Sequence, residues 1–295
     1  MLYAFLIKII KTIIIAIILP AIIGMGQQAF GQDVKRVALI SNHISKTELQ
    51  AIQTMHSESR KKNYELDLLD LRELNQARLS AYDVIWYHRT DTIPFSSDEL
   101  NALTHIKNYV QLGGNLFLSM EAMPLLNKAG WEKMPIEMQR DSVIDAGFGR
   151  PLGFHAFKSH DIFDGLMGGA YVSKQTKNHA VRKHGFFENN KPLQGKTIGI
   201  DWTYITFNEQ NKVLLEYKVG KGKVIAAGAY LYFAPENHNR QHLYAFTENV
   251  FTYLSGKKTS GKSYYWNFLD SGFVSAKFNF PPIIPVSAVT WNLPK

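Results

Sequence analysis

Five polar side chains stand where ligands bind in open α/β proteins, just beyond apolar runs that have the character of strands. They are His43, His88, Arg89, Glu121 and Glu236. The carboxyl ends of parallel strands meet at one edge of a sheet, so we expect these residues around one crevice. Carboxylates, imidazoles and a guanidinium suit a sugar or a carboxylated small molecule. The alternative is that all five are exposed loop residues.

The same residues also suggest acid–base chemistry. Glu121 can act as a general base or hold a ligand hydroxyl, and with His43 or His88 it would serve a hydrolase or isomerase. Its alternative role is a strand-end carboxylate that accepts from backbone N–H groups. Ser119 precedes it, but the Gly-x-Ser-x-Gly pattern of a nucleophile elbow is missing.

Cysteine chemistry is excluded, because the chain has 0 cysteines. Its 10 histidines raise the possibility of a metal, and His238 and His242 lie four apart. Neither this pair nor the other spacings has the third ligand or the glutamate of a zinc hydrolase, so we expect no metal and no cofactor. The strand aromatics Trp86, Trp202 and Tyr230 are expected in the core.

Strand and helix patterns alternate through the first half of the chain. The expected strands are 34–41, 64–69, 81–87 and 115–119, and the expected helices are 47–62 and the stretch from the capping box Ser96/Glu99 to Gly113-Gly114. This alternation predicts an α/β fold, a three-layer sandwich with a mostly parallel sheet covered on both faces.

The second half departs from this rhythm. Residues 131–196 lack periodicity and are expected to form a long excursion over one end of the sheet. Strands at 197–207, 212–219 and 223–229 follow, two of them joined by a hairpin turn, and then a helix at 241–254. Residues 257–295 form a linker and an extended aromatic tail, which is either an arm packed on the domain or a contact for a protein partner.

Residues 1–31 have the pattern of an export signal, with Lys8 and Lys11 before an apolar run and small residues at 29–31. We expect a periplasmic or extracellular protein, membrane-attached only if this segment stays uncleaved. Residues 32–256 then form one domain. Removing Lys8 and Lys11 from a net charge of +8 leaves +6. The scattered lysines favour a solvated surface over a nucleic-acid partner.

Four places resemble a known superfamily: YDVIW (82–86), GGNLFLS (113–119), HDIFDGL (160–166), and GKVIAAG (222–228) leading to FAPE (233–236). Over roughly residues 34–256 the chain resembles the class I glutamine amidotransferase-like superfamily and, within it, the exported trehalose-utilisation-like branch. The resemblance implies a flavodoxin-like fold.

The resemblance also implies which chemistry is missing. The superfamily carries a nucleophilic cysteine at the elbow, where this chain has Met120 and Glu121, and a catalytic histidine at the position of Ala234. Glu236 matches the last member of that triad but has no histidine to orient. The implied function is carbohydrate-related binding or an accessory role, without amidotransferase activity.

Overall fold

The structure, a computed structural model, describes residues 35–59, 64–144, 152–157, 160–166, 169–171, 179–187, 192–203, 206–237 and 240–256. The export signal and the aromatic tail predicted from the sequence lie outside these residues. Within them, no helix combines the length and the apolar character needed to cross a bilayer.

The described helices and short 3-10 turns are α2 (Lys46–Glu58), η1 (Leu71–Glu73), α3 (Gln76–Leu79), α4 (Ser97–Leu112), α5 (Leu125–Lys128), η2 (Asp161–Phe163) and α6 (Arg240–Leu254). Three of these helical elements, α2, α4 and α6, were expected from the sequence, whereas α3, α5 and the two short 3-10 turns were not. At the start of α4, Ser96 accepts from the backbone N–H of Glu99, and Glu99 accepts from that of Ser96. The predicted capping box is confirmed.

Nine strands form one sheet in the order β2-β1-β3-β4-β11-β10-β9-β6-β7. Their bounds are β1 (Lys35–Ile40), β2 (Tyr64–Leu69), β3 (Val84–Arg89), β4 (Asn115–Met120), β6 (Leu152–Ala156), β7 (Gly169–Tyr171), β9 (Lys196–Thr203), β10 (Thr206–Val219) and β11 (Gly222–Ala227). The first five strands of that order pair in parallel. The later pairs are antiparallel, which sets only β10 and β6 against the other seven strands.

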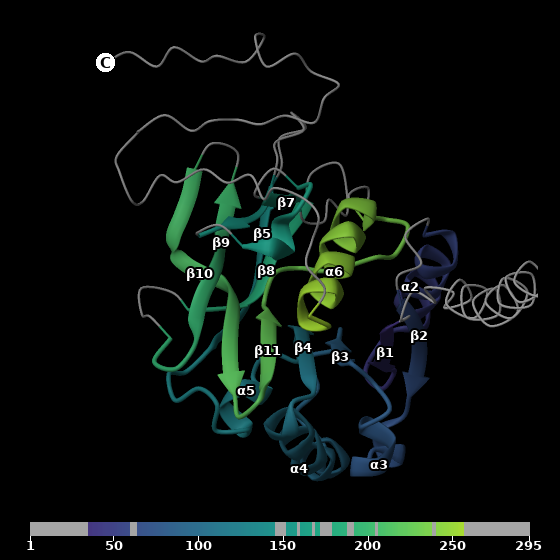
Figure 1. Cartoon of the computed structure of the whole chain (residues 1–295). Coiled ribbons are helices and arrows are strands. Elements are labelled where there is room, and N and C mark those ends of the chain that lie inside the picture. Colours follow the sequence, from purple (N-terminus) through teal and green to yellow (C-terminus); the bar gives the residue numbers. More distant parts are fainter. Residues whose placement is uncertain are drawn as a thin grey trace, which may run out of the picture. The chain divides into compact units, whose positions relative to one another are not determined.

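Side chains alternate between the two faces of this sheet. Val37 and Leu39 of β1 pack into a cluster with α2 and α6, whereas Ala38 and Ile40 pack into a second cluster with α3 and α4. Figure 1 shows α6 on one face and α4 beneath the sheet. Helix, sheet and helix layers therefore confirm the predicted flavodoxin-like α/β sandwich.

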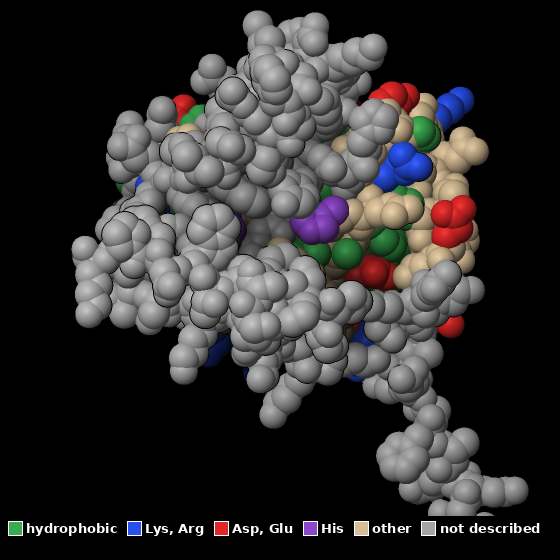
Figure 2. Space-filling model, turned by 90° about the horizontal axis from the view of Figure 1, so that it is seen from above, with side chains coloured by type: hydrophobic (Ala, Val, Ile, Leu, Met, Phe, Trp, Pro, Cys, Tyr) green, Lys and Arg blue, Asp and Glu red, His purple; other side chains and the backbone are tan. Residues whose placement is uncertain are grey.

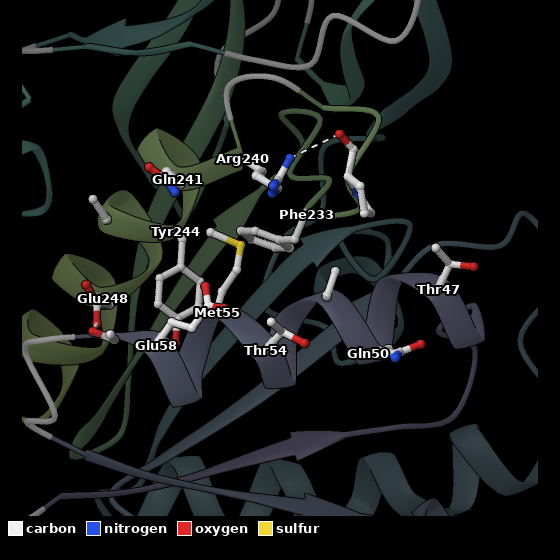
Figure 3. Close-up of a pocket in the computed structure, with 14 residues that line it drawn as sticks. Thr47, Gln50, Thr54, Met55, Glu58, Phe233, Arg240, Gln241, Tyr244 and Glu248 are labelled. Carbon is white, nitrogen blue, oxygen red and sulfur yellow. Dashed lines mark hydrogen bonds between the residues drawn. The ribbon is translucent and has the colours of Figure 1, made fainter.

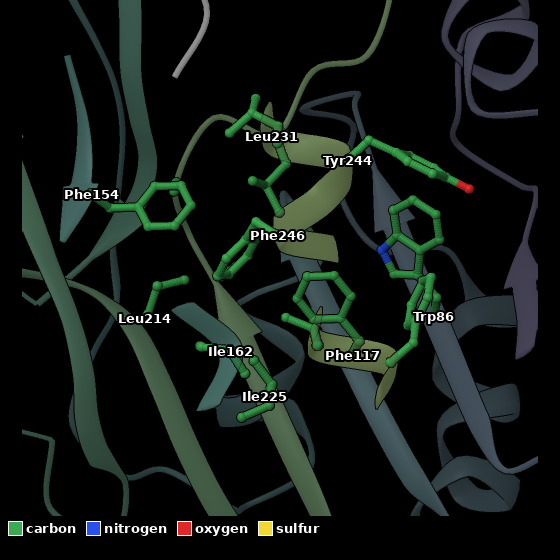
Figure 4. Close-up of a cluster of buried hydrophobic side chains, with 14 of the residues drawn as sticks. Trp86, Phe117, Phe154, Ile162, Leu214, Ile225, Leu231, Tyr244 and Phe246 are labelled. Carbon is green, nitrogen blue, oxygen red and sulfur yellow. The ribbon is translucent and has the colours of Figure 1, made fainter. Parts of the chain in front are cut away.

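The cluster under α6 is rich in aromatic rings, among them Trp86, Phe117 and Phe246, each with 0% of its surface exposed (Figure 4). The Trp86 ring stacks on Phe117 with centroids 6.0 Å apart and meets Phe251 edge-on at 5.4 Å. Such pairs contribute about 0.5–1.5 kcal/mol beyond area burial. The prediction that Trp86 belongs to the core is confirmed.

The segment predicted as an excursion differs from the structure. Strands β6 and β7 extend the main sheet, and β5 (Glu137–Ile144) pairs with β8 (His179–Phe186) in a separate two-stranded sheet. Short antiparallel strands at an edge contain no long apolar run, so periodicity did not reveal them. Figure 2 shows acidic and basic side chains interspersed with hydrophobic ones where its face is described.

Strand β6 carries a buried ionisable group, His155, which generates a pH prediction. Burial lowers the pKa of His155 to about 4, although its ring Nδ1 lies 2.9 Å from the carbonyl oxygen of Ala156. An unfolded histidine titrates near pH 6.5. The unfolded chain therefore binds the extra proton between those values, and stability falls as the pH drops from about 6.5 to about 4.

We expect His155→Gln to remove this component, on the order of 3 kcal/mol between pH 7 and pH 4. Urea unfolding of wild type and variant at both pH values measures it. His105→Gln, in helix α4, is the matched control and should follow the wild-type curve. Parallel pH profiles for wild type and His155→Gln would contradict the expectation.

Candidate functional site

Strand β4 ends in a sharp turn at the position where the resemblance expects a nucleophile. Met120 occupies it with φ of 57°, a left-handed conformation that is uncommon for residues other than glycine. Its side chain is only 1% exposed. The backbone N–H of Glu121 donates to the carbonyl oxygen of Arg89 at 3.1 Å, which ties the turn to the end of β3. The sharp turn after the strand is present, but the thioether side chain of Met120 occupies the position of the nucleophile and is buried in the core.

Beside the elbow, four buried side chains form a hydrogen-bonded chain. Trp86 Nε1 donates to Ser119 Oγ at 2.9 Å, and Ser119 Oγ lies 2.7 Å from His88 Nδ1. His88 Nε2 lies 3.3 Å from Glu48 Oε1. A carboxylate only accepts, so the ring proton belongs on Nε2 and the serine hydroxyl donates to Nδ1.

The order serine, histidine, acid matches a catalytic triad in residue type. Ser119, His88 and Glu48 are all 0% exposed, as is Trp86. A nucleophile must reach a substrate carbonyl, and a hydroxyl enclosed in the core cannot do so. These hydrogen-bonded side chains therefore position β3, β4 and α2 relative to one another.

Glu48 also fastens the turn after β11. Its Oε1 accepts from the backbone N–H of Phe233 at 2.8 Å, and its Oε2 accepts from that of Ala234, also at 2.8 Å. Ala234 is 0% exposed and stands where the resemblance expects a catalytic histidine. A buried carboxylate from helix α2 thus binds this turn directly.

A second polar cluster lies beyond the carboxyl ends of β1 and β3. It consists of His43, Arg89, Asp91 and Glu99, and we call it the rim. His43, with φ of 66°, places Nδ1 at 2.8 Å from Asp91 Oδ2 and Nε2 at 3.3 Å from Glu99 Oε2. The side chains of His43 and Asp91 are 20% and 29% exposed, whereas that of Glu99 is 0% exposed. The imidazole therefore bridges a buried acid and one that reaches solvent.

Arg89 contacts Asp91 and Glu99, the two acids that also contact His43. Its Nη2 lies 3.2 Å from Asp91 Oδ1, and its Nε lies 3.3 Å from Glu99 Oε1. The guanidinium carbon lies 4.5 Å from the centre of the Phe95 ring. The Tyr87 hydroxyl donates to Glu99, and burial followed by this carboxylate raises the pKa of Tyr87 far above its usual value. Asp91 is the member of this network with the largest exposed fraction.

The structure divides the predicted residues among different surroundings. His43 and Arg89 share the rim cluster, whereas His88 lies in the buried chain one layer deeper. Glu121 is half-buried after β4, and Glu236 is exposed in the turn before α6. Beside the imidazoles of His43 and His88 lie the carboxylates of Glu48, Asp91 and Glu99.

Sequence reasoning missed Glu48 and Asp91, and it considered Ser119 only as a nucleophile, which the missing Gly-x-Ser-x-Gly pattern argued against. Asp91 stands two residues after Arg89 in the same loop, which is a usable signal. Glu99 was recognised only as a capping residue. In the described part of the chain, no group of three or more His, Cys, Asp or Glu side chains is arranged to hold a metal ion. The rim offers hydrogen-bond acceptors and the imidazole of His43, which are groups that can bind hydroxyls.

No protein-family model and no curated protein matches the chain. Among solved structures, several match most of this chain at low sequence identity. A ThuA-like protein from Bacteroides uniformis is 13% identical with a TM-score of 0.46, covering 77% of this chain and 93% of that one. Another, from Parabacteroides merdae, is 12% identical with a TM-score of 0.46, covering 79% and 95%.

A β-galactosidase from Bacillus circulans is also similar, at 12% identity and a TM-score of 0.47. The match covers 76% of this chain but 31% of the β-galactosidase, so the chain spans under a third of that enzyme. Proteins described as ThuA-like are thus among the structural neighbours of this chain.

The hydrogen bonds that the Glu48 carboxylate accepts from the turn after β11 lead to a stability prediction. Glu48→Ala leaves the N–H groups of Phe233 and Ala234 and the ring of His88 without their acceptor, so we expect a loss of about 3–5 kcal/mol. Urea unfolding followed by far-UV circular dichroism measures it. The exposed Glu65→Ala in β2 is the control, expected within about 0.5 kcal/mol of wild type. If Glu48→Ala lowers the free energy of unfolding by less than about 1 kcal/mol, these hydrogen bonds do not stabilise the domain as proposed.

Proposed function

We propose that this chain is an exported binding domain of the amidotransferase-like fold that recognises a saccharide and performs no amidotransferase reaction. One observation carries the proposal: the reactive positions are filled by buried groups. Met120 is 1% exposed at the elbow, and Ser119, His88 and Glu48 are 0% exposed beside it. Nothing in this layer can attack a substrate, while the rim above it reaches solvent.

The rim supports recognition of hydroxyl groups. Asp91 is partly exposed, and although its Oδ1 is buried, its Oδ2, which contacts His43 at 2.8 Å, has a second lone pair that can accept from a sugar hydroxyl. His43 is held against Asp91 and Glu99, so the site is ordered before a ligand arrives, which lowers the cost of binding. The sugar class itself comes from the resemblance to the trehalose-utilisation-like branch. In this proposal His88, Arg89 and Glu121 support the rim, and Glu236 flanks it.

The remaining parts of the proposal concern location and partners. The signal at 1–31 directs the domain to the periplasm or outside the cell, and the aromatic tail at 257–295 docks on a protein partner. The basic residues serve solubility, with no nucleic-acid partner.

The saccharide proposal predicts a defined loss on mutation. Asp91→Asn removes the charge of the most exposed acceptor at the rim, and we expect affinity for a bound glycan to fall about tenfold, since hydrogen bonds to charged groups contribute about 1.5–3 kcal/mol. Calorimetry against a glycan panel identifies the ligand and measures the change. Glu65→Gln, an exposed carboxylate at the opposite end of the sheet, should bind as wild type does. No response of the folded wild-type protein to any glycan would reject the proposal.

A second candidate is a hydrolase or isomerase, favoured by the contacts of His43. An imidazole that reaches solvent between two carboxylates can transfer protons. This candidate predicts conversion of a bound glycan to a new product, lost by at least 100-fold in His43→Gln. Chromatography of the glycan after incubation decides between the two, because a pure binding domain returns it unchanged.

A further inference from the structure

A groove separate from the rim lies between helices α2 and α6, on the face of the sheet that both helices cover (Figure 3). Its volume is about 510 Å³, within the range of about 300–1,000 Å³ typical of small-molecule sites. None of His43, Asp91 or Glu99 lines it.

The floor of the groove is apolar and its edges are polar. Its accessible apolar surface comes from the partly buried Ala51 and Met55 of α2 and Ala245 of α6, which pack over Phe233 and Tyr244, 0% and 4% exposed. Exposed amides stand at the edges, Gln50 on α2 and Gln241 on α6. An apolar base with hydrogen-bonding amides above it suits the C–H face and the hydroxyls of a sugar ring.

Two hydrogen bonds connect residues that line the groove. Ser59 Oγ, after the end of α2, donates to Glu248 Oε1 of α6 at 2.6 Å. Arg240 Nη1 donates to the carbonyl oxygen of Pro235 at 3.0 Å, the bond drawn in Figure 3. A ligand of one or two rings fits the volume of about 510 Å³.

The charge of the groove is opposite to that of the whole protein. Its charged lining residues are Glu58, Glu248 and Arg240, which sum to −1. Without its signal the chain carries +6, obtained by removing Lys8 and Lys11 from +8. Anions are drawn to the protein as a whole, whereas this groove disfavours them.

We propose that the α2–α6 groove is a second saccharide site, distinct from the rim, that takes neutral and amino sugars and rejects uronic acids. Glu58 and Glu248 supply the preference for a cationic or neutral ring. Gln50 and Gln241 bind its hydroxyls, and Met55 packs against its apolar face.

The test uses glucose, glucosamine and glucuronate, which share a ring and differ mainly in charge. NMR-monitored titration of the wild-type protein should give the affinity order glucosamine, glucose, glucuronate, and Glu58→Gln should reduce the gap between the first and the last. Adsorption on the basic surface would place glucuronate first, and that order would overturn the proposal.

Variants locate the binding. Gln50→Ala and Gln241→Ala should each weaken binding of glucosamine about fivefold, the effect of one hydrogen bond. Gln53→Ala, an exposed glutamine of α2 outside the groove, is the matched control and should leave affinity unchanged. Unchanged affinity in both groove variants would overturn the proposal.

Asp91→Asn separates this inference from the rim proposal. Binding that is lost in Asp91→Asn and retained in both groove variants would overturn the groove and support the rim alone. The opposite pattern would support the groove and overturn the rim.

Discussion

The carboxylate of Glu48 is the interaction on which the arrangement of this domain depends. It is 0% exposed, yet it accepts from two backbone N–H groups of the turn after β11 and faces His88 of β3. Burying an acid is costly unless several donors meet it. The two elements that supply those donors, β3 and the turn after β11, are consequently fixed relative to α2, and with them the base of the rim and one wall of the groove.

Glu99 has the corresponding role one layer further out. It caps α4 through Ser96, contacts Arg89 and His43, and accepts from Tyr87. The two acids differ in what they support. Glu48 holds backbone and so shapes the scaffold, whereas Glu99 holds side chains, of which Arg89 and Tyr87 are buried and His43 reaches solvent. A scaffold without a nucleophile can therefore still present an ordered polar surface.

Sequence patterns predicted β1 to β4, β9 to β11 and the helices α2, α4 and α6, because periodicity and caps are local properties, but they did not reveal the strands β5 to β8. Nor did they predict the partners of the polar residues. Ser45 and Glu48 have the spacing of Ser96 and Glu99, and both serines accept from the backbone N–H three residues on. Glu99 completes a capping box, but the carboxylate of Glu48 turns to a loop 185 residues away. Identical local signals thus lead to different contacts, and only the packing of helix on sheet decides between them.

That separation has a consequence for how the domain acquires its structure. Glu48 meets Phe233 across 185 residues, and the hydroxyls of Tyr64 and Tyr244 meet across 180. Contacts so distant form late, since a long loop must close before they contribute. A chain that leaves the ribosome from its amino end exposes β1, α2 and β3 well before the turn that completes them. Until residues 233–234 emerge, Glu48 lacks the two backbone donors that it has in the folded domain, and α2 has only apolar contacts such as that of Ile52 to hold it on the sheet.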